Sequence, residues 1–304
     1  MKNYRIAAII GYGSIGIRHA KVLNKIKIFK KIYVVTKRKI KCKHEIIRSI
    51  KDLKFINPDY FLICSETSSH YRQVKFLNDN FKKKIIFVEK PLFNKNYNLK
   101  IKNNNKIYVG YNFRFHPIIQ FLKKKVRNKK ILSTTILSGS YLPNWRKNIS
   151  YKESYSGNHR KGGGVLLDLS HEFDYTSWIL GKLNMKYYYY KKISNLDISS
   201  KDFFSFTGSS LKSKYVQINL DYFSRIPKRL IILEGNKFSF HADLIKNEVR
   251  FKYFSKLKLF KFNKAALNKS YLKQHLNILF ERKKITCTYK EGLNLLDSFE
   301  AFNI

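Results

Sequence analysis

The chain has 304 residues, of which 44% are hydrophobic and 15% aromatic, so it can bury a substantial core and is not an intrinsically disordered protein. No apolar run approaches the roughly 18 residues of a membrane-spanning helix, and the first apolar run is too short for a signal peptide, so we expect a cytoplasmic protein without a membrane partner. Its three cysteines are widely spaced and predict neither a disulfide framework nor a metal site.

The formal net charge of +42 has two interpretations. A strongly basic chain can bind nucleic acid or another anionic surface. The excess is mostly lysine, however, and is spread along a chain rich in Asn, Ile, Tyr and Phe, whose codons are A/T-rich, so base composition can supply much of it. Lysine runs at 82–84 and 123–125 belong to no recognised nucleic-acid module. Nucleic-acid binding is therefore the weaker interpretation, although the charge would favour acidic small molecules such as nucleotide-linked sugars.

Near the N-terminus, a short apolar strand at 6–10 leads directly into a glycine-rich turn and a helix. The turn reads G-x-G-x-x-G, with Gly11, Gly13 and Gly16. In this context the first glycine allows a tight turn, the second lets a pyrophosphate approach the backbone, and the third lets helix and strand pack closely. The stretch predicts dinucleotide binding at a helix N-terminus, the alternative being a structural β–α turn.

The second expected strand, 31–36, ends without a carboxylate. A dinucleotide-binding fold usually places Asp or Glu here to hydrogen-bond the adenosine ribose. This chain has Thr36, Lys37 and Arg38 instead, a hydroxyl and two cations that suit a 2′-phosphate. NADP is therefore slightly preferred over NAD.

Further strands and helices alternate up to residue 117. The pattern predicts a helix at 42–53, a strand at 60–64, a helix at 71–77, and strands at 84–88 and 107–109. Polar groups follow two of these strands, Ser65 to His70 after one and Glu89-Lys90 after another, at the sheet edge where ligands bind. The Ser and Thr residues could also cap the next helix. Pro91 restricts the backbone of Lys90 and would direct this lysine into a cleft.

The second half combines one polar helix with many strands. A helix at 117–127 and a strand at 131–138 precede the loop 141–146. Glycines at 162–164 then open an expected helix at 165–180, on which Asp168, His171 and Glu172 would share one face. Six strands are expected at 187–193, 203–208, 215–223, 229–234, 237–241 and 248–253, and closing helices at 269–280 and 291–302. This pattern is typical of a broad antiparallel sheet.

Five motifs occur in an order and at spacings that resemble the Gfo/Idh/MocA oxidoreductases, the family of glucose–fructose oxidoreductase and inositol dehydrogenase. They are GYGSIGIRHAKVL, SETSSH, VEKPLF, VGYNFRFHP and GGGVLLDLSHEFDY. The resemblance implies an α/β protein with a Rossmann domain at 1–117, built on a parallel sheet, and a substrate-binding and oligomerisation domain at 118–304, built on a large, mostly antiparallel sheet. It also implies NAD(P)-dependent hydride transfer to or from a sugar, nucleotide sugar or polyol, and pairing into a homo-oligomer through the open face of the second sheet.

The resemblance also assigns site residues. Lys90 would stabilise the charge on the reacting oxygen, His171 would serve as general acid/base because its ordinary pKa is near working pH, and Asp168 would orient the pair. The implied cofactor contacts are Gly11, Gly13, Ser14, Ile15, Gly16, Thr36, Lys37, Arg38, Ser65, His70, Glu89, Lys90, Trp145 and Arg146. Two departures matter: only two residues separate Asp168 from His171 where many relatives have three, and Glu66 stands where the family often has proline.

These features predict an NAD(P)-dependent sugar dehydrogenase or reductase, with a role in surface-glycan biosynthesis as a family-level inference. The alternatives are a non-catalytic dinucleotide sensor and, less favoured, a basic nucleic-acid-binding protein. The lysine and histidine expected of the enzyme argue against the sensor.

Overall fold

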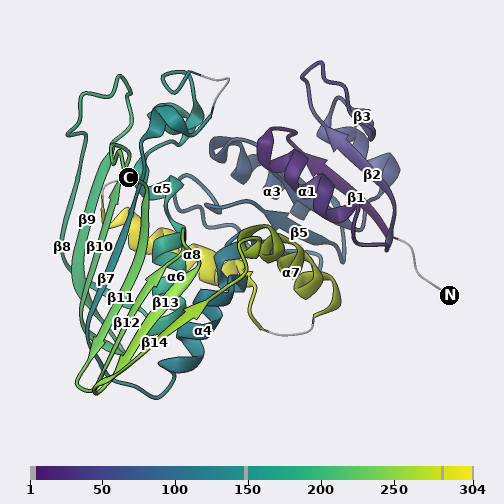
Figure 1. Cartoon of the computed structure of the whole chain (residues 1–304). Coiled ribbons are helices and arrows are strands. Elements are labelled where there is room, and N and C mark those ends of the chain that lie inside the picture. The colour runs from purple at the N-terminus through teal and green to yellow at the C-terminus, as the bar shows by residue number, and fades with distance from the viewer. Residues whose placement is uncertain (1–4, 147–149, 282–283, 303–304) are drawn as a thin grey trace. The chain divides into compact units, whose positions relative to one another are not determined.

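The computed structural model describes residues 5–146, 150–281 and 284–302 and divides into two compact units (Figure 1). The first unit comprises Met1–Asn112 and Tyr271–Ile304, and the second comprises Phe113–Ser270. The sequence predicted domains at 1–117 and 118–304, whereas the structure assigns the closing segment to the first unit. The physical reason is hydrophobic burial, because Tyr271, Ile278 and Leu279 of the helix α7 (Ala266–Phe280) belong to the core of that unit.

The first unit is a doubly wound sheet of seven strands in the order β15-β6-β5-β4-β1-β2-β3. All neighbours are parallel except β15, which runs antiparallel to β6. The strands are β1 (Arg5–Ile10), β2 (Phe29–Val35), β3 (Glu45–Ile47), β4 (Tyr60–Ile63), β5 (Ile85–Val88), β6 (Lys106–Val109) and β15 (Cys287–Thr288). The helices besides α7 are α1 (Ser14–Leu23), α2 (Leu53–Ile56), α3 (Thr67–Asn80) and α8 (Tyr289–Glu300). The predicted parallel Rossmann sheet is confirmed.

Helices cover both faces of this sheet (Figure 1). On one face, α1 and α7 pack on β1 and β4 through a cluster that includes Ala7, Ile9, Ala20, Leu23, Tyr60, Leu62 and Ile278. Successive strand residues point to opposite faces of a sheet, so Phe61 lies on the other face. There the centroids of the Phe61 ring and of the Phe81 ring, at the end of α3, are 4.7 Å apart. Burial on both faces explains why these strands read as continuous apolar runs.

The helix predicted at 42–53 is wrong. The segment instead forms the edge strand β3, a 3-10 turn (Ile50–Asp52) and the single-turn helix α2. Ile46 and Ile47 pair with Val34 and Val35 of β2, and Ile47 is buried. Two adjacent β-branched side chains suit a pleated surface better than a helix, and pairing with β2 stabilises them there.

The second unit is built on an eight-stranded sheet in the order β14-β13-β12-β11-β7-β10-β9-β8, with one parallel pair, β7–β10. Its strands are β7 (Ile131–Gly139), β8 (Leu183–Lys191), β9 (Phe203–Ser210), β10 (Ser213–Asp221), β11 (Lys228–Gly235), β12 (Phe238–Asp243), β13 (Glu248–Tyr253) and β14 (Lys256–Lys261). The helices α4 (Pro117–Lys125), α5 (Val165–Asp168) and α6 (His171–Leu180) lie against one face (Figure 1). The mostly antiparallel sheet is confirmed, and β14 is a strand that the pattern did not predict.

The polar helix predicted at 165–180 is interrupted. The segment α5 ends at Asp168, and α6 begins at His171. At the junction the amide of Glu172 bonds the carbonyl of Leu169, three residues back, at 3.2 Å. Asp168 and His171 therefore stand on two separate helical segments, and the shared helix face expected from their spacing does not exist. Within the described ranges, no helix combines the length and apolarity needed to cross a membrane.

Candidate functional site

The predicted cofactor residues of the first unit meet at one edge of its sheet. Hydrogen bonds join the loops at the carboxyl ends of β1, β2, β4 and β5 in pairs. The amide of Gly11 donates to the carbonyl of Val35 at 3.0 Å, that of Cys64 to Ile10 at 2.7 Å, and that of Glu89 to Ile63 at 2.9 Å. The glycine turn and the segments beginning at Thr36, Ser65 and Glu89 thus form one continuous rim, where ligands of open α/β sheets bind.

Two glycines of the turn are required by packing, and the third faces open space. Gly11 has φ +91°, and a Cβ there would lie 2.7 Å from the amide nitrogen of Ser65. A Cβ on Gly16 would lie 2.3 Å from the carbonyl oxygen of Gly11, whereas a Cβ on Gly13 would meet no atom within 4 Å. Gly13 is also the N-cap of α1 and supplies no side-chain acceptor to its first amides, which begin at Ser14 and Ile15. The turn therefore fits an approaching pyrophosphate.

The loop after β2 presents cations to solvent. Thr36 is buried and its hydroxyl accepts a bond from the amide of Arg38 at 3.2 Å, while Lys37 and Arg38 are exposed. The guanidinium of Arg48 holds this loop, because its Nη1 donates to the carbonyls of Thr36 at 3.2 Å and Arg38 at 2.8 Å. Sequence reasoning missed Arg48, since no local pattern shows that β3 returns its far end to this loop.

His70 ties two loops of the rim together. Its Nδ1 lies 3.1 Å from the carbonyl oxygen of Pro91, and its Nε2 lies 3.2 Å from that of Ser65. The ring is 1% exposed, and burial lowers the pKa of His70. Its geometry is that of a positioning residue, while direct contact with a cofactor stays a prediction. His70 lies on α3, which begins after Glu66, and this N-cap residue makes no side-chain capping hydrogen bond.

Glu89 and Lys90 lie at the end of β5 in different environments. Glu89 is buried, with its Oε1 2.7 Å from Nε2 of His19 and its Oε2 accepting the backbone amide of Lys90 at 3.3 Å. A Cβ on Gly110 would lie 2.9 Å from Oε1, so the backbone of the next strand closes over the carboxylate. Lys90 is half-buried, and its peptide bond to Pro91 is cis. Glu89 is therefore a hydrogen-bond acceptor held in a fixed position, and Lys90 is the next residue of the loop at this edge of the sheet.

In the second unit, Asp168 is held by aromatic residues of the sheet. The phenol of Tyr222 donates to its Oδ2 at 2.6 Å, and burial together with Asp168 raises the pKa of Tyr222 well above its usual value. Burial and the same carboxylate also raise the pKa of Tyr190. Trp145 packs edge-on against Tyr222, with ring centroids 5.2 Å apart, and its indole donates to Ser140 at 2.8 Å. The structure therefore brings Asp168 and Trp145 together through Tyr222, a residue that the sequence analysis missed.

His171 begins α6 and lies beside Phe113, with ring centroids 4.8 Å apart. A cation also lies over the Phe113 ring, since the guanidinium of Arg229 lies 4.3 Å from its centroid and donates to the fully buried Glu172 at 2.7 Å. This ion pair fixes the first turn of α6 next to the histidine. Glu172 is thus a structural carboxylate and not part of a polar face directed at a ligand.

Asp174 is likewise committed to structure. The Nε of Arg114 lies 3.0 Å from both of its carboxylate oxygens, and Nη2 lies 2.7 Å from Oδ1. Both side chains are at most 4% exposed, so removing either would leave an uncompensated buried charge at a cost of about 3–5 kcal/mol. Asp174, like Glu172, is therefore held by an arginine in a buried ion pair.

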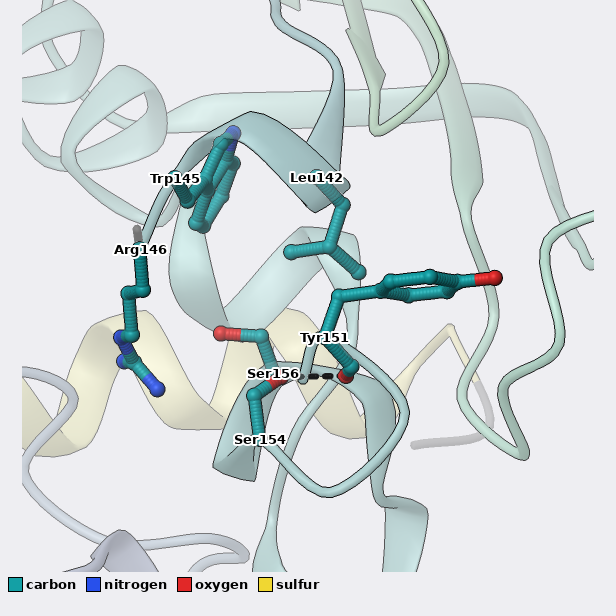
Figure 2. A pocket seen from close by; sticks show the side chains of 6 residues that line it. All are labelled: Leu142, Trp145, Arg146, Tyr151, Ser154 and Ser156. Atoms are coloured by element: carbon teal, nitrogen blue, oxygen red, sulfur yellow. Dashed lines mark hydrogen bonds between the residues drawn. The ribbon is translucent and has the colours of Figure 1, made fainter. Parts of the chain in front are cut away.

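A small pocket with room for about one water molecule lies beside Trp145 (Figure 2). Its lining comprises Leu142, Trp145, Arg146, Tyr151, Ser154 and Ser156. Figure 2 shows the guanidinium of Arg146 on one side, the indole above it and the two serines below. The hydroxyl of Ser154 donates to the carbonyl of Tyr151 at 2.7 Å, which fixes the lower wall. The lining combines an apolar wall, three hydroxyl-bearing residues and one cation around a space too small for a sugar ring.

Within the part of the chain that the structure describes, no group of three or more His, Cys, Asp or Glu side chains is arranged to hold a metal ion. Cys42, Cys64 and Cys287 are free thiols.

Comparison with known proteins confirms the resemblance drawn from the sequence motifs over residues 6–111. Residues 6–111 match the Gfo/Idh/MocA family model, described as an oxidoreductase family with an NAD-binding Rossmann fold. A search of curated proteins found no match.

Solved structures share the fold along nearly the whole chain. UDP-N-acetylglucosamine 3-dehydrogenase GnnA from Acidithiobacillus ferrooxidans is 14% identical, with 98% of this chain and 96% of that chain covered and a TM-score of 0.76. The WlbA dehydrogenase from Bordetella pertussis, in complex with NADH and UDP-GlcNAcA, is 15% identical, with 99% and 95% covered and a TM-score of 0.78. GenD2 from gentamicin A biosynthesis, in complex with NAD, is 15% identical, with 98% and 93% covered and a TM-score of 0.80.

Proposed function

Because residues 6–111 carry the NAD-binding Rossmann fold of the Gfo/Idh/MocA oxidoreductases, we propose that this chain is a nicotinamide-dependent dehydrogenase or reductase of sugars. The observation that carries the proposal is the glycine turn. Gly11 and Gly16 are closed by their own backbone neighbours, while Gly13 opens onto empty space in front of the first amides of α1. A purely structural β–α turn has no need for an open glycine between two packed ones.

The bound dinucleotide would supply the hydride acceptor or donor, which no side chain can provide. We propose that its pyrophosphate lies on the Gly11–Gly16 turn and that Thr36, Lys37 and Arg38 face its adenosine ribose. The exposed cations and the guanidinium that fixes their loop support NADP as the preferred form. Several structural neighbours are complexes with NAD or NADH, so the cofactor choice of this chain needs its own measurement.

We assign the acid–base chemistry to three residues. Lys90 would hydrogen-bond the reacting oxygen of the substrate and stabilise its developing negative charge. His171 would take the hydroxyl proton during oxidation and return it during reduction. Asp168, held by Tyr222, would fix the orientation of the substrate or of the histidine. The neighbouring ion pairs of α6 keep the histidine in place without competing for the proton.

For the substrate we propose a nucleotide sugar, in surface-glycan biosynthesis. Two structural neighbours are described with such molecules, one as a UDP-N-acetylglucosamine 3-dehydrogenase and one as a complex with UDP-GlcNAcA. The excess of positive charge would also attract a diphosphate.

The test is a fluorescence titration with NADPH and NADH in moderate salt, followed by turnover assays on UDP-sugars. Saturable binding of either nucleotide and NAD(P)H-linked turnover are the expected results. Binding without turnover of any sugar would favour the dinucleotide sensor. Failure to bind either nucleotide would refute the proposal.

A further inference from the structure

Behind Glu89 lies a chain of hydrogen bonds that the proposed chemistry does not use. Nε2 of His19 on α1 lies 2.7 Å from Oε1 of Glu89 on β5, and Nδ1 of the same ring lies 2.7 Å from Nε2 of His275 on α7. Nδ1 of His275 lies 2.8 Å from the hydroxyl of Tyr60 on β4. His19, His275 and Tyr60 are all 0% exposed. Four elements of the first unit are thus joined through one line of polar atoms.

With both imidazole rings neutral, every hydrogen bond of this line donates toward Glu89. An ionised carboxylate only accepts hydrogen bonds, so His19 donates from Nε2, and when this ring is neutral its Nδ1 is an acceptor. His275 then has to donate from Nε2, and its own Nδ1 accepts the proton of Tyr60. Two neutral imidazoles in the Nε2–H tautomer satisfy every atom of the line. Burial lowers the pKa of His275 well below its usual value, in agreement with a neutral ring at this position.

The arrangement cannot carry protons to or from the site. Moving every proton one step would leave Glu89 protonated and Tyr60 as a phenolate. Burial raises the pKa of Tyr60 well above its usual value, and its side chain has no contact with solvent through which to regain a proton. A hydrogen-bond line that cannot release its protons holds its side chains in place and does not transfer protons to the site.

The other oxygen of Glu89 connects this line to the rim. Oε2 accepts the backbone amide of Lys90, the proposed oxygen-stabilising lysine. The imidazole of His19 is itself held by aromatic rings, with Phe87 at 5.1 Å and Tyr271 at 5.5 Å between centroids. A shift of His19 would therefore free the carboxylate that fixes the lysine backbone.

We propose that His19 is a positioning residue whose tautomer, set by His275 and Tyr60, holds Glu89 and through it the backbone of Lys90. The inference rests on the proposed function only in what Lys90 does; the hydrogen-bond line stands on its own geometry. The closing helix α7 therefore supplies core side chains and also His275, the residue that selects the tautomer of His19.

The first test reads the tautomers directly by ¹⁵N NMR of histidine-labelled protein at neutral pH. We expect His19 and His275 both as neutral Nε2–H tautomers, assigned by comparison with single-residue variants. An Nδ1–H tautomer or an imidazolium at either ring would overturn the proposal, whether or not the protein binds a nucleotide.

The second test compares two variants of His275. A glutamine keeps an N–H donor near the place of Nε2, whereas His275→Leu removes it. We expect NADH affinity and turnover to fall about tenfold in the leucine variant, as for loss of a hydrogen bond to a charged group, and to be largely restored in His275→Gln. If both variants melt at lower temperature but bind NADH as the parent does, His275 is merely structural and the proposal falls. Absence of NADH binding in the parent would refute the proposed function and not the tautomer assignment.

Discussion

Replacing Gly13 by alanine separates cofactor binding from folding more cleanly than any other change in the glycine turn. Gly13 has φ −84° and ψ −165°, a conformation that alanine adopts without strain. The added methyl would meet no protein atom within 4 Å. Stability should change by less than about 1 kcal/mol, because alanine restricts the unfolded chain more than glycine does, whereas glycine is the better N-cap of α1. The methyl would nevertheless stand where the pyrophosphate has to approach the backbone.

We expect Gly13→Ala to weaken NADH and NADPH binding by at least about tenfold, the loss of one hydrogen bond to a charged group. Fluorescence titration gives the affinity, and thermal unfolding with circular dichroism gives the stability. The matched control is Gly16→Ala, whose Cβ would lie 2.3 Å from the carbonyl of Gly11 and which should lower stability. If Gly13→Ala binds both nucleotides as tightly as the parent, the pyrophosphate does not occupy this turn and the reasoning is refuted.

Three further predictions follow from the site and the core. Lys90→Ala should lower turnover of an identified substrate by about 10²–10³-fold at saturating cofactor, as for loss of a transition-state hydrogen-bond donor; full turnover would remove this lysine from the mechanism. Arg38→Ala should weaken NADPH binding about tenfold while NADH affinity changes by less than about twofold, and equal losses for both would contradict a 2′-phosphate contact. Burial raises the pKa of Tyr60, Tyr175 and Tyr222 in the folded state, so their protonated forms stabilise it fully below the unfolded pKa near 10. Stability should fall as pH rises above about 10, and urea unfolding that gives an unchanged free energy there would count against the burial of these phenols.

Local chemistry in the sequence was enough to predict the frame of the first unit. Gly11 has a positive φ, Gly16 packs on a backbone carbonyl, and Gly13 between them faces open space. Because the three glycines lie within six residues, their spacing in the sequence was enough to predict the turn. Continuous apolar runs predicted β1, β4 and β5, because a parallel strand buried on both faces needs apolar residues at every position. The antiparallel sheet followed from strand-length runs separated by turn signals.

What the sequence could not predict depends on partners far away in the chain. Ile46 and Ile47 become a strand because β2 offers an edge, and α7 joins the first unit because its apolar side chains complete the core there. The ion pair of Glu172 with Arg229 and the bond of Asp168 to Tyr222 span 57 and 54 residues.

His19 and His275 are 256 residues apart. A lone histidine in an apolar helix carries no local sign of its partner, so only the tertiary structure could show that the two rings meet. The reason is physical. Local backbone preferences come from neighbouring residues, whereas the partner of a buried polar atom is chosen by the packing of the whole unit, which must satisfy that atom once water is excluded.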